Sequence, residues 1–265
     1  MASESDNEGY TARLADFAAN LQWSDIPRDF QELLPVFIMD TVSSMILMKG
    51  PFQLCGVVQP VYQATTRMVK LTYGYGGNGS AYSAIDGTST SLSGAAFLNG
   101  VAAGCFEFEH VISTTHPASA MFPALLTVAA AYHKSGEELL TAMAVGYELC
   151  TRIGFACTKD VEEQRHFHNP GLNGHLATAA AVCRLMGWDA TITASAMGIA
   201  ASSSAGLMAF VNTGAMTKRL HPARSGQLGV EAAFLAKEGV VGPSDVIENP
   251  KGFLNAFSPN PSLST

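Results

Sequence analysis

Apolar residues recur along much of this chain with the spacing of helices. Between Tyr10 and Leu21 they form one side of an amphipathic helix, and Asp25-Ile26-Pro27 predicts a cap with proline in the first turn of a second helix that runs toward Gly50. Ala-rich segments interrupted by Gly predict further helices at roughly 90–103, 120–133, 137–155, 172–186, 190–210 and 225–238. Because small residues let helix backbones approach closely, we expect an all-α fold, a compact Ala/Gly-rich multi-helix bundle.

The remaining segments give weaker signals. Residues 57–72 fit either a helix or an extended segment. The acidic, polar residues 1–9 and the Pro-bearing residues 258–265 are expected to be flexible tails. The chain shows no internal repeat and no low-complexity linker, so we expect residues 1–265 to form a single helical domain.

The segment from Ala190 to Thr217 contains no Asp, Glu, Lys or Arg. Part of it, Ala194 to Asn212, has the length of a membrane span. However, four serines and one asparagine within that part make it a poor fit to hydrocarbon. We therefore expect a buried central helix and no membrane partner.

Composition narrows the class of protein. Hydrophobic residues make up 48% of the chain and charged residues only 14%, which is typical of a globular protein with a large core. A net charge of −7 without a basic run argues against a nucleic-acid partner. The five cysteines include no Cys-x-x-Cys, and the N-terminus is not a secretory signal, so we expect reduced thiols and a cytoplasmic location.

A group of cations follows the uncharged segment. Lys218, Arg219, His221 and Arg224 lie within seven positions. They fit two interpretations, which the sequence leaves open. They could complement the macrodipole at the C-terminal end of a long helix, or they could form a pocket for an anionic substrate.

A second charged group follows residues 87–106, which also contain no Asp, Glu, Lys or Arg. Glu107, Glu109, His110 and His116 then occur within ten positions. This group is either a solvated helix end or a set of proton-transfer groups at the edge of a pocket.

Two further motifs have weak support. His166 and His168 form a His-x-His pair that could bind a metal, but an imidazole titrates near neutral pH, and we favour proton transfer by a pocket histidine. Residues 74–79 match Gly-x-Gly-x-x-Gly, yet a turn-rich segment follows and Asp86 lies too close to be the acid of a dinucleotide site. We therefore expect no metal and no cofactor.

Several short sequence segments, taken in their order along the chain, form a combined pattern. They are Asp86-Gly87-Thr88, Ala95 to Ala102, Thr115-His116-Pro117-Ala118, Gly146-Tyr147-Glu148, Phe167-His168, Leu185 to Asp189 and Lys218-Arg219-Leu220-His221. This pattern resembles the MmgE/PrpD family, which includes 2-methylcitrate dehydratase and cis-aconitate decarboxylase, from about residue 12 to the end of the chain.

The resemblance implies a large all-helical domain that pairs with a smaller α/β domain, homodimers, and metal-independent chemistry on small-molecule di- and tricarboxylates. By position, His116, His168 and Lys218 match active-site residues of the family. Glu107 falls where the family usually has Asp.

Among the departures of the chain from the family, two bear most on the site. Glu107-Phe108-Glu109-His110 replaces the usual Asp-Phe-Asp-Asp. In addition, the chain ends about where the small domain would begin, so we expect the pocket to be open or closed by something else, such as a dimer partner.

These features suggest roles for the candidate residues. Lys218 and Arg219 would bind an anion with support from His221 and Arg224, His116 would be the general acid/base with His168 second, and Glu107 would orient or share protons. Three functions are compatible with this set: a dehydratase or decarboxylase, a repurposed isomerase or cyclase of specialised metabolism that uses the helical half alone, and a non-catalytic dimerisation or binding module.

Overall fold

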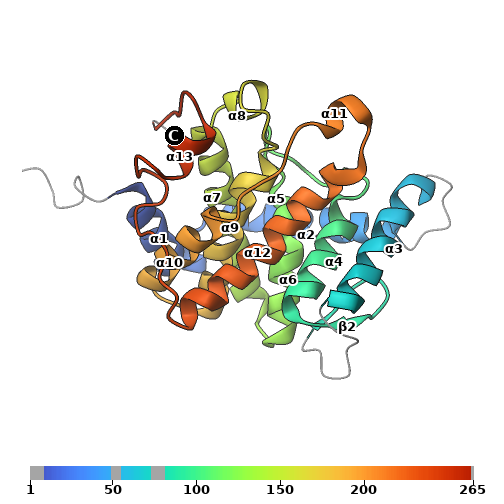
Figure 1. The fold of residues 1–265 in the computed structure, drawn as a ribbon. Helices are drawn as coiled ribbons and strands as arrows, with labels where there is room; N and C mark the ends of the chain where they lie inside the picture. The colour runs from blue at the N-terminus through green and yellow to red at the C-terminus, as the bar shows by residue number, and fades with distance from the viewer. Residues whose placement is uncertain (1–8, 49–54, 73–80, 264–265) are drawn as a thin grey trace, which may run out of the picture.

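The computed structural model describes residues 9–48, 55–72 and 81–263, and within them the fold is helical (Figure 1). The long helices are α1 (Tyr10–Asn20), α2 (Arg28–Leu47), α3 (Cys55–Thr72), α4 (Leu92–Gly104), α6 (Phe122–Ala131), α7 (Gly136–Ala156), α9 (Pro170–Met186), α10 (Ala190–Ala201) and α12 (Leu220–Lys237). The short helices are α5 (Pro117–Ala120), α8 (Asp160–Glu163), α11 (Phe210–Thr213) and α13 (Phe253–Phe257), with 3-10 turns η2 (Trp23–Asp25) and η3 (Met216–Arg219). One small antiparallel hairpin pairs β1 (Ala81–Tyr82) with β2 (Ser89–Thr90). The all-α prediction is confirmed.

Helices α9 and α12 form the centre of the bundle. Helix α12 packs against α4, α9 and α10, and α9 also packs against α7 (Figure 1). Glycines permit the closest crossings, because a Cβ at Gly100 would lie 2.8 Å from the Ala223 Cα, and one at Gly229 would lie 2.5 Å from the Thr178 Cβ. The small residues of the sequence therefore set the helix spacing, as predicted.

Some predicted boundaries differ from the structure. Helix α10 ends at Ala201 rather than near residue 210, because the chain turns at Ser202 and continues as a loop to α11. The ambiguous residues 57–72 belong to helix α3. The Asp25 carboxylate does not cap α2; it accepts the backbone N–H of Gln22 at 2.9 Å, within the turn before that helix.

The segment after α13 packs onto the bundle. Ser258 is buried, and the backbone N–H of Ser262 donates to the Ala156 carbonyl at 2.9 Å. The Asn260 amide donates to Asp160 at 2.8 Å. These contacts hold residues 258–263 against α7 and α8. The sequence, which predicts a flexible tail here, gives no sign of them. The expected tail at residues 1–8 and the glycine motif at residues 74–79 lie outside the described residues.

Helix α2 is the one described helix whose length and apolar composition would allow it to cross a membrane. It packs against α4 and α7, but only 22% of its most apolar window is buried. Leu33, Val36, Met39 and Ile46 expose an apolar strip on its outer side. The expected central helix at Ala194–Asn212 is instead divided between α10, a loop and α11.

Candidate active site

The cation group lies at the beginning of α12. The turn η3 carries Lys218 and Arg219 and leads directly into α12, on which His221 and Arg224 lie in the first turns. The interpretation of these cations as the C-terminal end of a long helix is therefore wrong. Gly214 ends the short helix α11 with a φ of 64° and turns the chain toward η3.

Lys218 and Glu107 form an ion pair across the site. The Lys218 Nζ lies 2.6 Å from the Glu107 Oε2, although the residues are far apart in the chain. Glu107 has a φ of 55°, an uncommon conformation for a residue other than glycine, which turns the chain sharply after α4. The ammonium also lies 5.9 Å from the centre of the Phe210 ring. The structure thus brings two of the predicted residues together.

Three histidines form a group near this pair. The ring centres of His116 and His168 are 6.1 Å apart, and the Nδ1 atoms of His168 and His221 are 3.2 Å apart. Burial and the neighbouring His221 lower the pKa of His168 to about 3. Burial also lowers the pKa of His221. His168 is therefore neutral at neutral pH and can accept a hydrogen bond.

Two carboxylates that the sequence prediction does not assign also reach the site. The Glu109 Oε1 lies 3.2 Å from the Nδ1 of His116, and the Glu109 side chain is only 1% exposed. Glu162, on α8, accepts the backbone N–H of Asn169 at 3.0 Å, and His116 and Lys218 are close enough to act on its charge. Burial raises the pKa of Glu162 despite that hydrogen bond and those two neighbours.

The sequence offers a signal for only one of these two residues. Glu109 belongs to the charged group that follows α4, which the sequence already marks as a possible set of proton-transfer groups. Glu162 lies among the acids Asp160 and Glu163, and such a group ordinarily forms a solvated surface.

The two predicted arginines have structural partners. The Arg219 Nε donates to the carbonyl of Cys105 at 3.0 Å, at the end of α4. Arg224 donates to the Gln227 side chain at 2.6 Å and lies over the Phe97 ring, 4.5 Å from its centre. Both therefore brace α12 against α4, and their predicted role in substrate binding stays a prediction.

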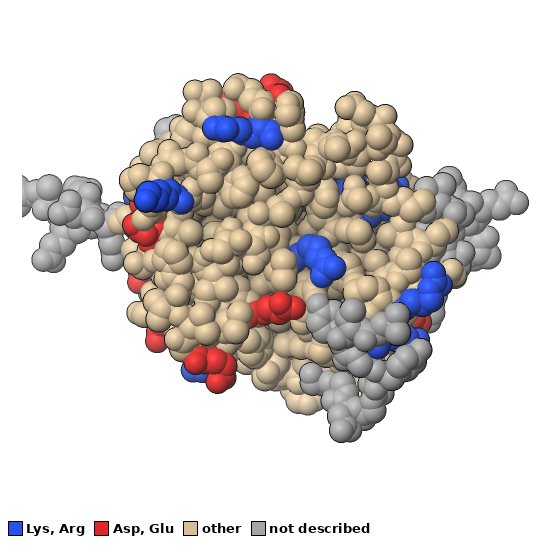
Figure 2. Space-filling view, in the orientation of Figure 1, with Lys and Arg blue, Asp and Glu red and all other residues tan. Residues whose placement is uncertain are grey.

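A cavity of about 580 Å³ opens beside His221. It lies between α9, the first turns of α12 and the loop that precedes α11. Its lining is mostly apolar. His175, Arg224 and Thr217 contribute polar groups. Figure 2 shows that this face of the molecule carries few charges and that its upper edge is notched between the protrusions of α8 and α11.

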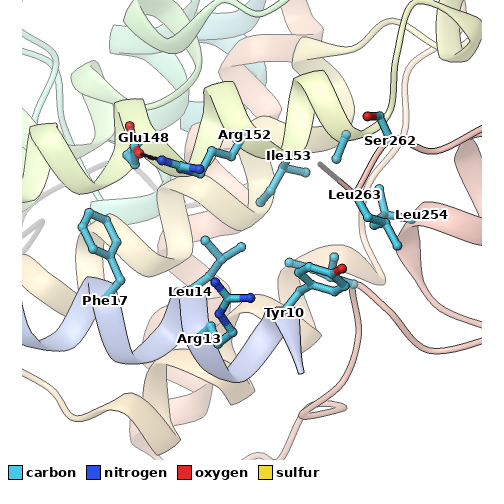
Figure 3. A pocket seen from close by; sticks show the side chains of 12 residues that line it. Tyr10, Arg13, Leu14, Phe17, Glu148, Arg152, Ile153, Leu254, Ser262 and Leu263 are labelled. Atoms are coloured by element: carbon cyan, nitrogen blue, oxygen red, sulfur yellow. Dashed lines mark hydrogen bonds and ion pairs between the residues drawn. The ribbon is translucent and has the colours of Figure 1, made fainter. Parts of the chain in front are cut away.

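A separate groove of about 480 Å³ lies between α1, α7 and the C-terminal segment (Figure 3). Its floor includes Leu14 and Ile153, and Arg13 projects from one wall. On the opposite wall the Arg152 Nε donates to the Glu148 carboxylate at 2.6 Å, which neutralises that cation (Figure 3). The groove contains none of the predicted site residues, so we place the candidate active site at the histidine group instead.

The His-x-His pair does not converge on one point. His166 is exposed with a φ of 59°, whereas His168 is buried. Within the described residues, no group of three or more His, Cys, Asp or Glu side chains has an arrangement that could hold a metal ion.

A model of the MmgE/PrpD N-terminal domain matches residues 12–265. The chain belongs to the MmgE/PrpD family. The match covers every described residue of the candidate site, and it confirms the resemblance that the sequence segments show.

Curated proteins of this family resemble the chain over different lengths. Human cis-aconitate decarboxylase is 36% identical over 171 residues, which are 63% of this chain and 35% of the human protein. The cis-aconitate decarboxylase-like protein oryM of Aspergillus oryzae is 30% identical over 97% of this chain and 53% of its own length. Cis-aconitate decarboxylase of Aspergillus terreus is 25% identical over 97% and 52%. In the two matches that cover nearly the whole chain, the chain spans about half the length of the relative.

Proposed function

We propose that this chain is the helical part of a lyase that dehydrates or decarboxylates a small polycarboxylate without a metal ion. The observation that carries the proposal is the convergence of Lys218 and Glu107 with His116, His168 and His221 at one end of α12. The names of the MmgE/PrpD relatives, which are cis-aconitate decarboxylases, support this class of reaction.

Lys218 would bind a carboxylate of the substrate. Its side chain is 27% exposed, and its ammonium already faces an anion, the Glu107 carboxylate. A substrate carboxylate can take the same position, because charge-assisted hydrogen bonds to an ammonium are among the stronger ones. Glu107 would then be free to orient the substrate or to share a proton.

His116 would transfer the proton. In a decarboxylation, the bond to the leaving carboxylate breaks, carbon dioxide departs, and the electron pair stays on carbon until His116 protonates it. In a dehydration, a base removes the proton next to a carboxylate while an acid protonates the departing hydroxyl. His168, neutral through burial, serves as a hydrogen-bond acceptor beside His116.

A second candidate function is an isomerase or cyclase that acts on a larger, less charged molecule. The mostly apolar cavity beside His221 favours it, because small polycarboxylates do not need such a lining. Both candidates use His116 for proton transfer, and they differ in the substrate that binds.

We also propose, from the family resemblance, that the protein forms a homodimer in the cytoplasm. Sedimentation analysis of the purified chain tests the dimer, and a monomer over the whole concentration range contradicts it.

Proton NMR in D₂O tests the proposed lyase reaction. The full chain is incubated with citrate, 2-methylcitrate, cis-aconitate and itaconate, beside the His116→Ala and Lys218→Ala variants. We expect product formation or deuterium uptake that His116→Ala lowers at least about 100-fold. If none of the four compounds reacts with the wild type or binds to it in a calorimetric titration, the lyase proposal fails. The isomerase or cyclase candidate then takes its place.

A further inference from the structure

Glu109 is a buried carboxylate with one described partner. The residue is 4% exposed, and its only hydrogen bond within the described part of the chain joins Oε1 to the Nδ1 of His116. Its other oxygen, Oε2, is buried without a hydrogen-bond partner among the described residues. Burying a carboxylate is costly unless a partner compensates for the lost water. The imidazole of His116 is the group in position to do so.

The neighbouring residue fixes the chain on the opposite side. The backbone N–H and the Nδ1 of His110 lie 2.8 and 2.7 Å from the Asp40 Oδ2, and its Nε2 contacts the Tyr147 hydroxyl. The Phe37 ring stacks on the same imidazole, with centres 4.4 Å apart. His110 is therefore anchored to α2 and α7, and this anchor helps to keep Glu109 turned toward the interior.

The turn before His116 is fixed as well. Ile112 and Thr115 exchange two backbone hydrogen bonds, of 3.1 and 3.0 Å, and Pro117 begins α5 directly after His116. Both ends of the segment that joins Glu109 to His116 are thus held, and the carboxylate and the imidazole meet in a set geometry.

From this geometry we propose that Glu109 is the positioning residue of His116. An ionised carboxylate only accepts hydrogen bonds, so it selects the tautomer of His116 that carries its proton on Nδ1. The Nε2 atom then keeps the lone pair and is the nitrogen available to a substrate. Carboxylates that fix the tautomer of a catalytic histidine have this effect in other enzymes. The inference rests on the proposed function only in taking His116 as the acid/base group.

Other charged and titratable groups also face His116. Glu162 from α8 and His168 from the segment before α9 lie next to it, and Lys218 from η3 lies close to both of those residues. Glu162 is the competing carboxylate, but its Oε1 is occupied by the backbone N–H of Asn169. Glu162→Gln is therefore the matched control for a change at Glu109.

The test reads the tautomer of His116 directly. Long-range ¹H–¹⁵N NMR spectra of the full chain, labelled with ¹⁵N-histidine, distinguish Nδ1–H from Nε2–H, and His116→Gln assigns the signals. We expect Nδ1–H in the wild type, a change to mainly Nε2–H in Glu109→Leu, and Nδ1–H in Glu109→Asp and in Glu162→Gln. The His110 signals in the same spectra show whether the loop keeps its anchor.

The wild-type spectrum alone overturns the proposal if His116 carries its proton on Nε2. An unchanged Nδ1–H tautomer in folded Glu109→Leu overturns it as well. Because the resting protein is observed, this result is independent of whether any polycarboxylate reacts. Where turnover is measurable, we expect Glu109→Leu to lower kcat by about 10- to 100-fold with little change in KM, and Glu109→Asp to restore part of it.

Discussion

Individual residues of the candidate site differ sharply in charge and burial. Lys218 is a partly exposed cation, whereas His168 is buried and stays neutral because its pKa lies at about 3. Glu109 is a buried carboxylate beside His116. Anion binding and proton transfer therefore fall to different side chains, and each role can be removed separately.

Replacing Lys218 by alanine tests anion binding alone. Because the substrate carboxylate would lose a charge-assisted hydrogen bond, we expect the affinity for cis-aconitate to fall by about 10- to 100-fold. Isothermal titration measures it. Lys237→Ala, at the far end of α12 and near Trp188, is the control and should bind as the wild type does. Equal affinities of the two variants would place the anion elsewhere.

The sequence identifies part of this site and misses the rest for physical reasons. Lys218 is conspicuous because charged residues are rare in such an apolar chain, and the family resemblance identifies His116 and His168 together with it. Glu162 looks like part of a solvated acidic turn, and only the fold shows that it faces His116. Arg219 binds the Cys105 carbonyl at the end of α4, and Arg224 lies over the Phe97 ring on α4; both contacts join residues more than a hundred positions apart in the chain.

At the scale of elements, close helix crossings depend on glycine. A Cβ at Gly229 would lie 2.5 Å from the Thr178 Cβ, so Gly229→Ala must push α12 away from α9. We expect a loss of about 1–3 kcal/mol in the free energy of unfolding, measured by urea denaturation. Gly136→Ala, where the added Cβ meets open space, should be neutral or slightly stabilising. Equal stabilities of the two variants would contradict this packing.

Helix α9 also buries a titratable group, His175, between itself and α12. Its Nδ1 lies 3.1 Å from the Ser225 hydroxyl, and burial lowers its pKa from 6.5 to about 4. The unfolded chain therefore binds a proton at higher pH than the folded chain does. Stability from this group is complete above about pH 6.5 and is lost as the pH falls toward 4.

We expect this loss to be on the order of 3 kcal/mol. Urea denaturation at about pH 7.5 and about pH 4.5 measures it, and His175→Gln should reduce the difference between the two pH values by that amount. His133→Gln changes an exposed histidine and serves as the control. If His175→Gln keeps the full acid destabilisation, the histidine is not buried in its neutral form.

The helices themselves are largely predictable, and their ends are less so. Apolar spacing locates α1, α7 and α9 to within a few residues, because their caps and glycines are local signals. Helix α10 is predicted too long, since the absence of charge continues past Ser202 while the helix does not. An uncharged segment indicates burial or low polarity, but it carries no signal for a helix end.

At the scale of the whole molecule, the first helix is bonded to the C-terminal part of the chain. The backbone N–H and the hydroxyl of Thr11 donate to the Glu248 Oε2, at 3.1 and 2.7 Å. The Thr11 hydroxyl also accepts the backbone N–H of Ile247 at 3.0 Å. Thr11 is fully buried, so these three hydrogen bonds close the bundle across 237 positions of sequence.

Thr11→Val keeps the shape of the side chain and removes its hydroxyl. The Ile247 N–H would lose its acceptor and Glu248 one donor, so we expect a loss of about 1–3 kcal/mol in the free energy of unfolding. Thr213→Val, at an exposed position, should change it by less than about 0.5 kcal/mol. In a double-mutant cycle with Glu248→Gln, direct contact predicts a coupling of about 0.5–3 kcal/mol. Additive effects would mean that Thr11 and Glu248 stabilise the fold independently of each other, which contradicts the direct contact.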